Sequence, residues 1–127
     1  MSSVIVLEQS GRFFRELKTE WSRQAVSGGG VGEIDDIESA GSVPEVFALA
    51  DASRSGVVVA DLAAGQPDVL RLLEGWDRVW PIVVIGSPDT GELEWPLREL
   101  GATTVLFEPV TPSRLLAMCQ RVLKNVT

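Results

Sequence analysis

The stretch Gly56-Val57-Val58-Val59-Ala60-Asp61 decides the fold of this chain. Five small or β-branched apolar residues are followed at once by a carboxylate. A run that is continuously apolar, rather than alternating with polar residues, is typical of a strand buried on both faces of a parallel sheet. Asp61 then falls at the carboxyl end of that strand, and open α/β sheets bind their ligands at this edge.

Three other runs have the same character and flank the first one along the chain. They cover residues 4–7, 82–85 and 104–107, and each is short and rich in β-branched residues. A fifth candidate, residues 31–37, alternates in polarity, which suits an edge strand protected by its charges. The Gly-rich residues 27–32 before it lack the Lys-Ser/Thr of a phosphate-binding loop, so we interpret them as a connector.

Segments with helical periodicity separate these strands. We expect five helices. Two of them cover residues 11–25 and 92–100. The other three begin at a capping box at Ser42, near Pro67 and at Thr111. The apolar residues at helical spacing, which we expect to face inward, are Phe14, Leu17, Trp21, Ala25, Phe47, Ala50, Leu70, Leu73, Trp76, Trp80, Leu115, Cys119, Val122 and Val126. On this inward face Cys119 is expected to be an inert thiol.

Strands and helices therefore alternate five times with short connections. This pattern predicts a single α/β domain over residues 1–127, with a doubly wound, three-layer, five-stranded parallel sheet. Five strands favour the flavodoxin-like order 2-1-3-4-5 over a six-stranded sheet.

Composition excludes several kinds of function. The 127 residues have a net charge of −7, a single cysteine and no histidine. Disulfides within the chain, Cys/His zinc sites and histidine-assisted nucleophilic catalysis are thus excluded, and we expect no enzyme activity. The acidic balance argues against nucleic acid as a partner.

We see neither a signal peptide nor an apolar run long enough to span a membrane, and expect a cytoplasmic protein.

Nearly the whole chain resembles the receiver domains of response regulators. Residues 57–62 look like the third strand of a receiver, which ends in the aspartate that accepts a phosphoryl group. Residues 81–87 look like the fourth strand, residues 101–110 like the Gly-Ala to Lys-Pro stretch, and residues 111–116 like the start of the last helix. The resemblance implies that Asp61 stands at the phosphoacceptor position.

Departures from the receiver pattern fall where that family carries out its chemistry. Receivers follow the first strand with two adjacent acids that hold Mg²⁺, whereas this chain has Glu8-Gln9. They end the fourth strand with a Ser or Thr hydroxyl; here this position falls on Gly86, and Ser87 comes one residue late. Only Asp61 keeps the family's residue.

The fifth strand departs as well. The family's lysine falls on Glu108, and the aromatic position three residues earlier falls on Val105. The resemblance of Glu108-Pro109 to the family's Lys-Pro implies a cis peptide bond here. The resulting degenerate phosphoacceptor pocket comprises Glu8, Gln9, Asp61, Gly86, Ser87, Glu108 and Pro109.

The charge at this edge predicts loss of phosphoryl transfer, which depends on cations that neutralise the phosphoryl oxygens. Replacing a lysine by Glu108 changes the local charge by two units, and each added like charge at ~4 Å costs about 4 kcal/mol at an effective dielectric near 20. We therefore expect a mouth without a built-in cation. The leading hypothesis is a pseudo-receiver: a non-catalytic signalling module that binds a protein without normal phosphorylation of Asp61.

Two alternatives stay open. One is an atypical receiver that is phosphorylated on Asp61, with Ser87 substituting for the missing hydroxyl. The other is a cation- or small-ligand-binding domain in which Glu8, Asp61 and Glu108 hold a metal, with Glu8 and Asp61 as the core ligands of Mg²⁺ or Ca²⁺. No other cofactor is expected.

The partner surface is expected on the face formed by the fourth helix, fifth strand and fifth helix, where receivers dock partners and second subunits. Trp95 lies off the apolar row of its helix, and an exposed tryptophan there would resemble an interface anchor, although partial burial is the favoured expectation. Trp95 and Val105 are the candidate interface residues. The partner would be a protein, and homodimerisation through this face is one form of that binding.

Overall fold

A computed structural model of the chain describes residues 2–26 and 34–126. Its sheet is parallel throughout, with the strand order β2-β1-β3-β4-β5. This is the order expected from the sequence. The strands are β1 (Ser2–Leu7), β2 (Ile34–Ala40), β3 (Gly56–Asp61), β4 (Ile82–Gly86) and β5 (Thr104–Phe107).

Helical elements connect every pair of consecutive strands. The α-helices are α1 (Arg12–Val26), α2 (Val43–Asp51), α3 (Gln66–Gly75), α4 (Glu94–Glu99) and α5 (Pro112–Val126). Two 3-10 helices, η1 (Leu62–Ala64) and η2 (Pro88–Leu93), follow β3 and β4. Ser42 caps α2 as expected, because its side chain accepts a hydrogen bond from the amide of Glu45.

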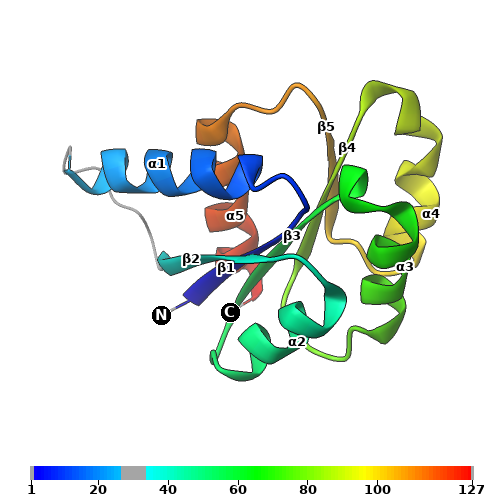
Figure 1. Cartoon of the computed structure of the whole chain (residues 1–127), viewed down its shortest axis with the longest axis horizontal. Coiled ribbons are helices and arrows are strands. Elements are labelled where there is room, and N and C mark those ends of the chain that lie inside the picture. The colour runs from blue at the N-terminus through cyan, green and yellow to red at the C-terminus, as the bar shows by residue number, and fades with distance from the viewer. Residues whose placement is uncertain (1, 27–33, 127) are drawn as a thin grey trace.

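The helices cover both faces of the sheet and complete three layers (Figure 1). Helices α1 and α5 bury one face, with Phe13, Leu17, Leu115 and Leu116 among its core residues. Helices α2, α3 and α4 cover the other face, with Val46, Leu72 and Leu97 among its core residues. The middle strands are buried on both sides, which explains why their sequences are continuously apolar.

Several local expectations were wrong in detail. Strand β2 runs to Ala40 rather than ending at Ile37, while the start expected at residue 31 lies outside the described residues. In α3 the inward row is Val69, Leu72 and Leu73, spaced as i, i+3 and i+4, so Leu70 is 37% exposed.

Two expected apolar rows extended beyond the face or end of their helix, and one expected helix began differently. Ala25, near the end of α1, is exposed. Trp76 and Trp80 follow α3, which ends at Gly75, although Trp80 is still buried. The expected helix over residues 92–100 begins as η2 and becomes α-helical only at Glu94. The side chain of Val126 and residues 27–33 lie outside what the structure describes.

Two finer expectations were confirmed. The Glu108–Pro109 peptide bond is cis. Cys119 is fully buried on α5, and burial raises the pKa of its thiol to about 12, so the thiolate is disfavoured. Within residues 2–26 and 34–126, no helix combines the length and the apolar composition needed to cross a membrane.

Candidate functional site

The carboxyl ends of β1, β3, β4 and β5 meet at one edge of the sheet. We call this edge the acidic mouth and define it by Glu8, Asp61, Gly86 and Glu108. Glu8 and Glu108 lie close enough to Asp61 for their charges to affect its pKa. The structure thus brings together the three carboxylates that strand order alone predicted.

Asp61 occupies the end of β3 and is only 7% exposed. Its Oδ1 accepts a hydrogen bond of 3.0 Å from the amide of Ala63 and thereby caps η1. The pKa of Asp61 is raised, chiefly by burial and further by the charges of Glu108 and Glu8, while the Ala63 hydrogen bond and Arg12 oppose the shift. This carboxylate is therefore more easily protonated than a solvated aspartate.

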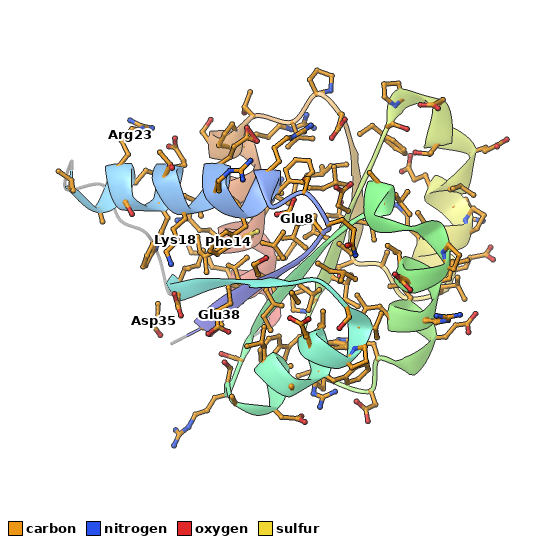
Figure 2. All side chains as sticks on the ribbon, in the orientation of Figure 1. Glu8, Phe14, Lys18, Arg23, Asp35 and Glu38 are labelled. Atoms are coloured by element: carbon orange, nitrogen blue, oxygen red, sulfur yellow. The ribbon has the colours of Figure 1, made fainter. Side chains whose placement is uncertain are left out.

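Glu8 has a structural task that its sequence position did not reveal. It is 3% exposed, and its carboxylate lies against the first turn of α1 (Figure 2). Oε1 accepts from the amide of Phe13 at 3.0 Å and Oε2 from the amide of Phe14 at 2.7 Å. Both oxygens are thus committed to amides that have no partner within the helix, and the negative charge also suits a helix N-terminus.

Gln9, at the second position after β1, does not contribute to the mouth. Its Nε2 donates a 2.9 Å hydrogen bond to the carbonyl oxygen of Gly41, in the connection between β2 and α2. The two residues that correspond to the metal-binding acids of receivers therefore serve as a helix cap and as a loop contact.

Arg12 corrects one expectation about the mouth. Its Nη2 lies 2.8 Å from Oε1 of Glu108, and its charge lowers the pKa of Asp61. The expectation of a mouth without a cation was wrong, because α1 brings Arg12 across to the end of β5. The two side chains are 49% and 31% exposed, so water screens this ion pair.

The end of β4 presents a hydroxyl from an unexpected residue. A Cβ on Gly86 would lie 2.5 Å from Oγ1 of Thr90 and 3.2 Å from Cδ1 of Leu62. Ser87, in contrast, donates to Oδ1 of Asp89 at 2.7 Å on an exposed part of the turn. Thr90, not Ser87, therefore occupies the space that a side chain at position 86 would fill. Only the three-dimensional contact between Thr90 and Gly86 reveals this placement, which residue spacing does not indicate.

The mouth does not present three free carboxylates to a metal ion. Among residues 2–26 and 34–126, no three His, Cys, Asp or Glu side chains are grouped so that they could hold one. In the expected set of Glu8, Asp61 and Glu108, Glu8 accepts from two amides and Glu108 pairs with Arg12. We therefore derive no chemistry through a metal.

The two candidate interface residues differ in exposure. Trp95 on α4 is 70% exposed, whereas Leu97 on the same helix is 1% exposed and anchors α4 to the sheet. The favoured partial burial of Trp95 was therefore wrong. Val105 is 6% exposed and belongs to the core beneath α2, α3 and α4, so it offers almost no surface for docking.

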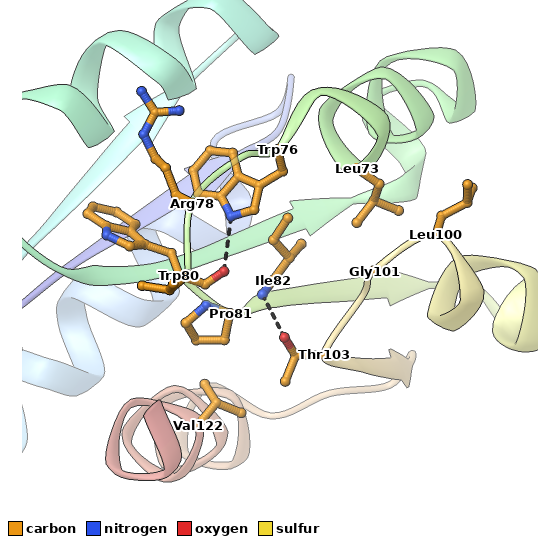
Figure 3. A pocket seen from close by; sticks show the side chains of 11 residues that line it. Leu73, Trp76, Arg78, Trp80, Pro81, Ile82, Leu100, Gly101, Thr103 and Val122 are labelled. Carbon is orange, nitrogen blue, oxygen red and sulfur yellow. Dashed lines mark hydrogen bonds between the residues drawn. The ribbon is translucent and has the colours of Figure 1, made fainter. Parts of the chain in front are cut away.

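One cavity lies away from the mouth, at the amino ends of β4 and β5. It has a volume of about 400 Å³, and its lining includes Leu73, Trp76, Pro81, Leu100 and Thr103 (Figure 3). The indole N–H of Trp76 already donates to the carbonyl oxygen of Trp80, and the hydroxyl of Thr103 accepts from the amide of Ile82. These polar groups therefore hold the loop that forms the wall.

Comparisons with known proteins identify the fold. No family model matches the chain, and no curated protein matches its sequence. Solved structures do match over the whole length. The receiver domain of the Francisella response regulator 1452 has a TM-score of 0.78 at 18% identity, covering 100% of both chains.

Two further matches agree. The receiver domain of the TMAO respiratory system response regulator TorR has a TM-score of 0.81 at 10% identity, covering 100% of both chains. The chemotaxis response regulator CheY4 of Vibrio cholerae has a TM-score of 0.67 at 22% identity, covering 96% of this chain and 98% of its own. At such identities the likeness concerns architecture alone. The chain therefore has the fold of the response-regulator receiver domain.

Proposed function

We propose that this chain is a pseudo-receiver, a signalling module that acts through protein contacts and without normal phosphorylation of Asp61. The main observation behind the proposal is that Glu8 caps the first turn of α1. Both of its oxygens accept backbone hydrogen bonds from α1. A cation placed beside Asp61 would have to take Glu8 from those amides or do without it.

Other contacts at the mouth support the same conclusion. Gln9 is uncharged and bonded to Gly41, so it supplies no second acid. Glu108 stands where a receiver has its lysine and adds negative charge beside Asp61. A phosphoryl group on Asp61 would bring more negative charge to a site with one screened arginine, and such transfer depends on fixed positive groups around the phosphoryl oxygens.

The test is exposure of the whole chain to acetyl phosphate with Mg²⁺, followed by intact-mass and peptide analysis. We expect no adduct on Asp61, while an active receiver treated in parallel is labelled. A matched variant, Gln9→Asp with Glu108→Lys, restores one acid and the lysine and should show more labelling than the parent. An adduct on the parent that Asp61→Asn abolishes would overturn the proposal.

A second candidate is favoured by Arg12. Because its guanidinium reaches the mouth, an atypical receiver could use Arg12 in place of the lysine on β5. In that case the parent is labelled, and Arg12→Ala lowers the labelling much more than Arg98→Ala, which removes an arginine of α4. Equal labelling of the two variants would exclude this role for Arg12.

We propose that α4 carries the partner surface, with Trp95 as its anchor. Exposed tryptophans are enriched among residues that dominate binding energy. The segment from residue 88 to residue 100 contains four acids and one arginine, which itself pairs with Glu94. Two copies of this face would bring like charges together, so we favour a basic protein partner over a homodimer.

Sedimentation of the chain over a range of concentrations tests this choice. We expect a monomer whose mass does not change with concentration, and the same result for Trp95→Ala. A dimer that Trp95→Ala dissociates, and that exposed Val79→Ala leaves intact, would instead establish self-association through α4. The proposed cytoplasmic location follows from the sequence alone and stays a prediction.

A further inference from the structure

The Thr90 side chain fills the space beside Gly86, where β4 has no side chain of its own. We infer that Thr90 is a positioning residue: its hydroxyl ties η2 to the end of β4 and so fixes the surface of α4 that carries Trp95. The role of this surface in partner binding rests on the function proposed above, but the coupling itself does not.

The hydrogen bonds of Thr90 close the first turn of η2 onto Ser87, the residue directly after β4. Its Oγ1 donates to the carbonyl oxygen of Ser87 at 2.8 Å, and its amide donates to the same oxygen at 3.0 Å. The same Oγ1 stands 2.5 Å from the position of a Cβ on Gly86. Glycine at 86 is therefore the residue that lets the Thr90 hydroxyl approach the strand this closely.

Thr90 also marks the irregular point of η2. Its φ and ψ of −102° and 16° are not helical, so η2 is kinked at this residue. Such dihedrals are found at the third residue of type I turns. The two bonds to Ser87 close this turn.

The link from Thr90 to Trp95 is short and continuous. Helix η2 ends at Leu93 and α4 begins at the next residue, Glu94. Leu93 packs partly buried against the core, and Leu97 is buried in it, while Trp95 points outward. A shift of Thr90 therefore reaches Trp95 through one helical segment that is anchored on its inner side only.

Two variants separate the hydroxyl from the shape of the side chain. Thr90→Ser keeps the donor to Ser87, whereas Thr90→Val keeps the branched shape and removes the donor. Amide and indole NMR spectra of the ¹⁵N-labelled chain supply the readout. We expect Thr90→Val to shift the amides of Ser87 and residues 89–95 and the indole of Trp95, and Thr90→Ser to leave the indole close to its parent position.

The Gly86→Ala variant disturbs the same contact between Gly86 and Thr90 by changing the residue on β4. The added methyl group should displace the Thr90 hydroxyl and move the Trp95 indole in the same direction as Thr90→Val does. Gly91→Ala is the matched control, because nothing lies within 4 Å of a Cβ at that position. Shifts that stop before Trp95, or equal effects of Thr90→Ser and Thr90→Val, would overturn the inference.

Urea unfolding gives an independent measurement if a variant is poorly folded. Gly86→Ala should lower the urea midpoint less when residue 90 is alanine than when it is threonine, because the displaced hydroxyl is then absent. Equal losses in both backgrounds would refute the contact. Phosphoryl labelling of Asp61 would overturn the proposed function and leave this outcome unchanged, so the two failures are distinguishable.

Discussion

The two edges of the sheet are held together by different kinds of contact. At the carboxyl edge, the contacts are polar: Glu8 binds amides of α1, and Arg12 binds Glu108. At the amino edge of β3 and β4, aromatic packing is added to hydrogen bonds such as that from the Trp76 indole to the Trp80 carbonyl oxygen. There the ring of Trp80 covers Gly56, and Phe47, Trp76 and Trp80 form a chain of ring contacts.

Arg78 shows how the amino edge uses even its charges for packing. Its guanidinium lies 4.9 Å from the ring centre of Phe47 and 5.3 Å from that of Trp76, and it also pairs with Asp51. The comparison teaches that the two edges stabilise the fold in different ways. The amino edge relies on ring packing, whereas the carboxyl edge relies on charged side chains such as Glu8, which caps α1.

The largest effect is expected at the amino edge, from Gly56→Ala. A Cβ at this position would overlap the carbonyl oxygen of Ser3 and lie 2.8 Å from the Trp80 ring, so a strand or the indole must move. We expect a loss of about 3 kcal/mol in the free energy of unfolding, measured in urea. Gly91→Ala, which meets open space, should change it little; similar losses for the two variants would break the comparison.

Glu8→Ala should have the next largest effect and is the strongest expected at the carboxyl edge. It removes a charged acceptor from two amides of α1, at a cost of about 2 kcal/mol. Urea unfolding, with amide exchange of Phe13 and Phe14, provides the measurement. Glu99→Ala, an exposed acid of α4, is the control, and an equally small effect of both would show that Glu8 is not a cap.

Asp61→Asn should alter how stability depends on pH. The pKa of Asp61 is raised in the folded chain by burial and by nearby acids, so the folded state holds its proton more tightly than the unfolded state. The parent therefore loses stability as pH rises through this pKa. The variant should be more stable than the parent at neutral pH, and the difference should vanish in acid.

Asp89 supplies a control of opposite sign. The hydrogen bond from Ser87 lowers the pKa of Asp89, so its contribution is present at neutral pH and is lost as pH falls through that pKa. Asp89→Asn should thus destabilise the chain at neutral pH relative to acid. Thermal unfolding across pH measures both variants, and slopes of the same sign would contradict this account.

Arg12→Ala is expected to have the smallest effect on stability. An ion pair this exposed contributes at most about 1 kcal/mol, and salt weakens it further. The sharper readout is the pKa of Asp61, measured by carboxyl ¹³C NMR, which should rise when Arg12 is removed and stay close to the parent in Arg12→Lys. An unchanged value would place Arg12 outside the mouth.

Sequence periodicity was sufficient to predict the strand order of the sheet and the position of Asp61 at the end of a strand. Continuous apolar strands and short connections constrain topology strongly, which is why the order β2-β1-β3-β4-β5 could be predicted. It was less reliable for helix faces. In α3 both Leu70 with Leu73 and Val69 with Leu72 have the spacing of an inward-facing row. Packing against the sheet decides between the two rows and buries Val69 and Leu72.

The contacts inside the mouth could not be predicted for a different reason. They depend on where long side chains point and not on spacing: Arg12 reaches a residue 96 positions away, and Thr90 turns back toward Gly86. Glu8 was correctly placed at the mouth, but its role as a cap was missed because no Ser, Thr, Asp or Asn directly precedes α1.

The way α1 begins has a consequence for any attempt to build a metal-assisted phosphoryl site into this scaffold. Freeing Glu8 for a metal would leave the amides of Phe13 and Phe14 without their acceptor. The residue just before the helix could not easily replace it, because Gly11 has a φ of +75°, which strains other side chains. Introducing such a site would therefore require rebuilding the β1–α1 turn first, so substitutions at the mouth alone would not be enough.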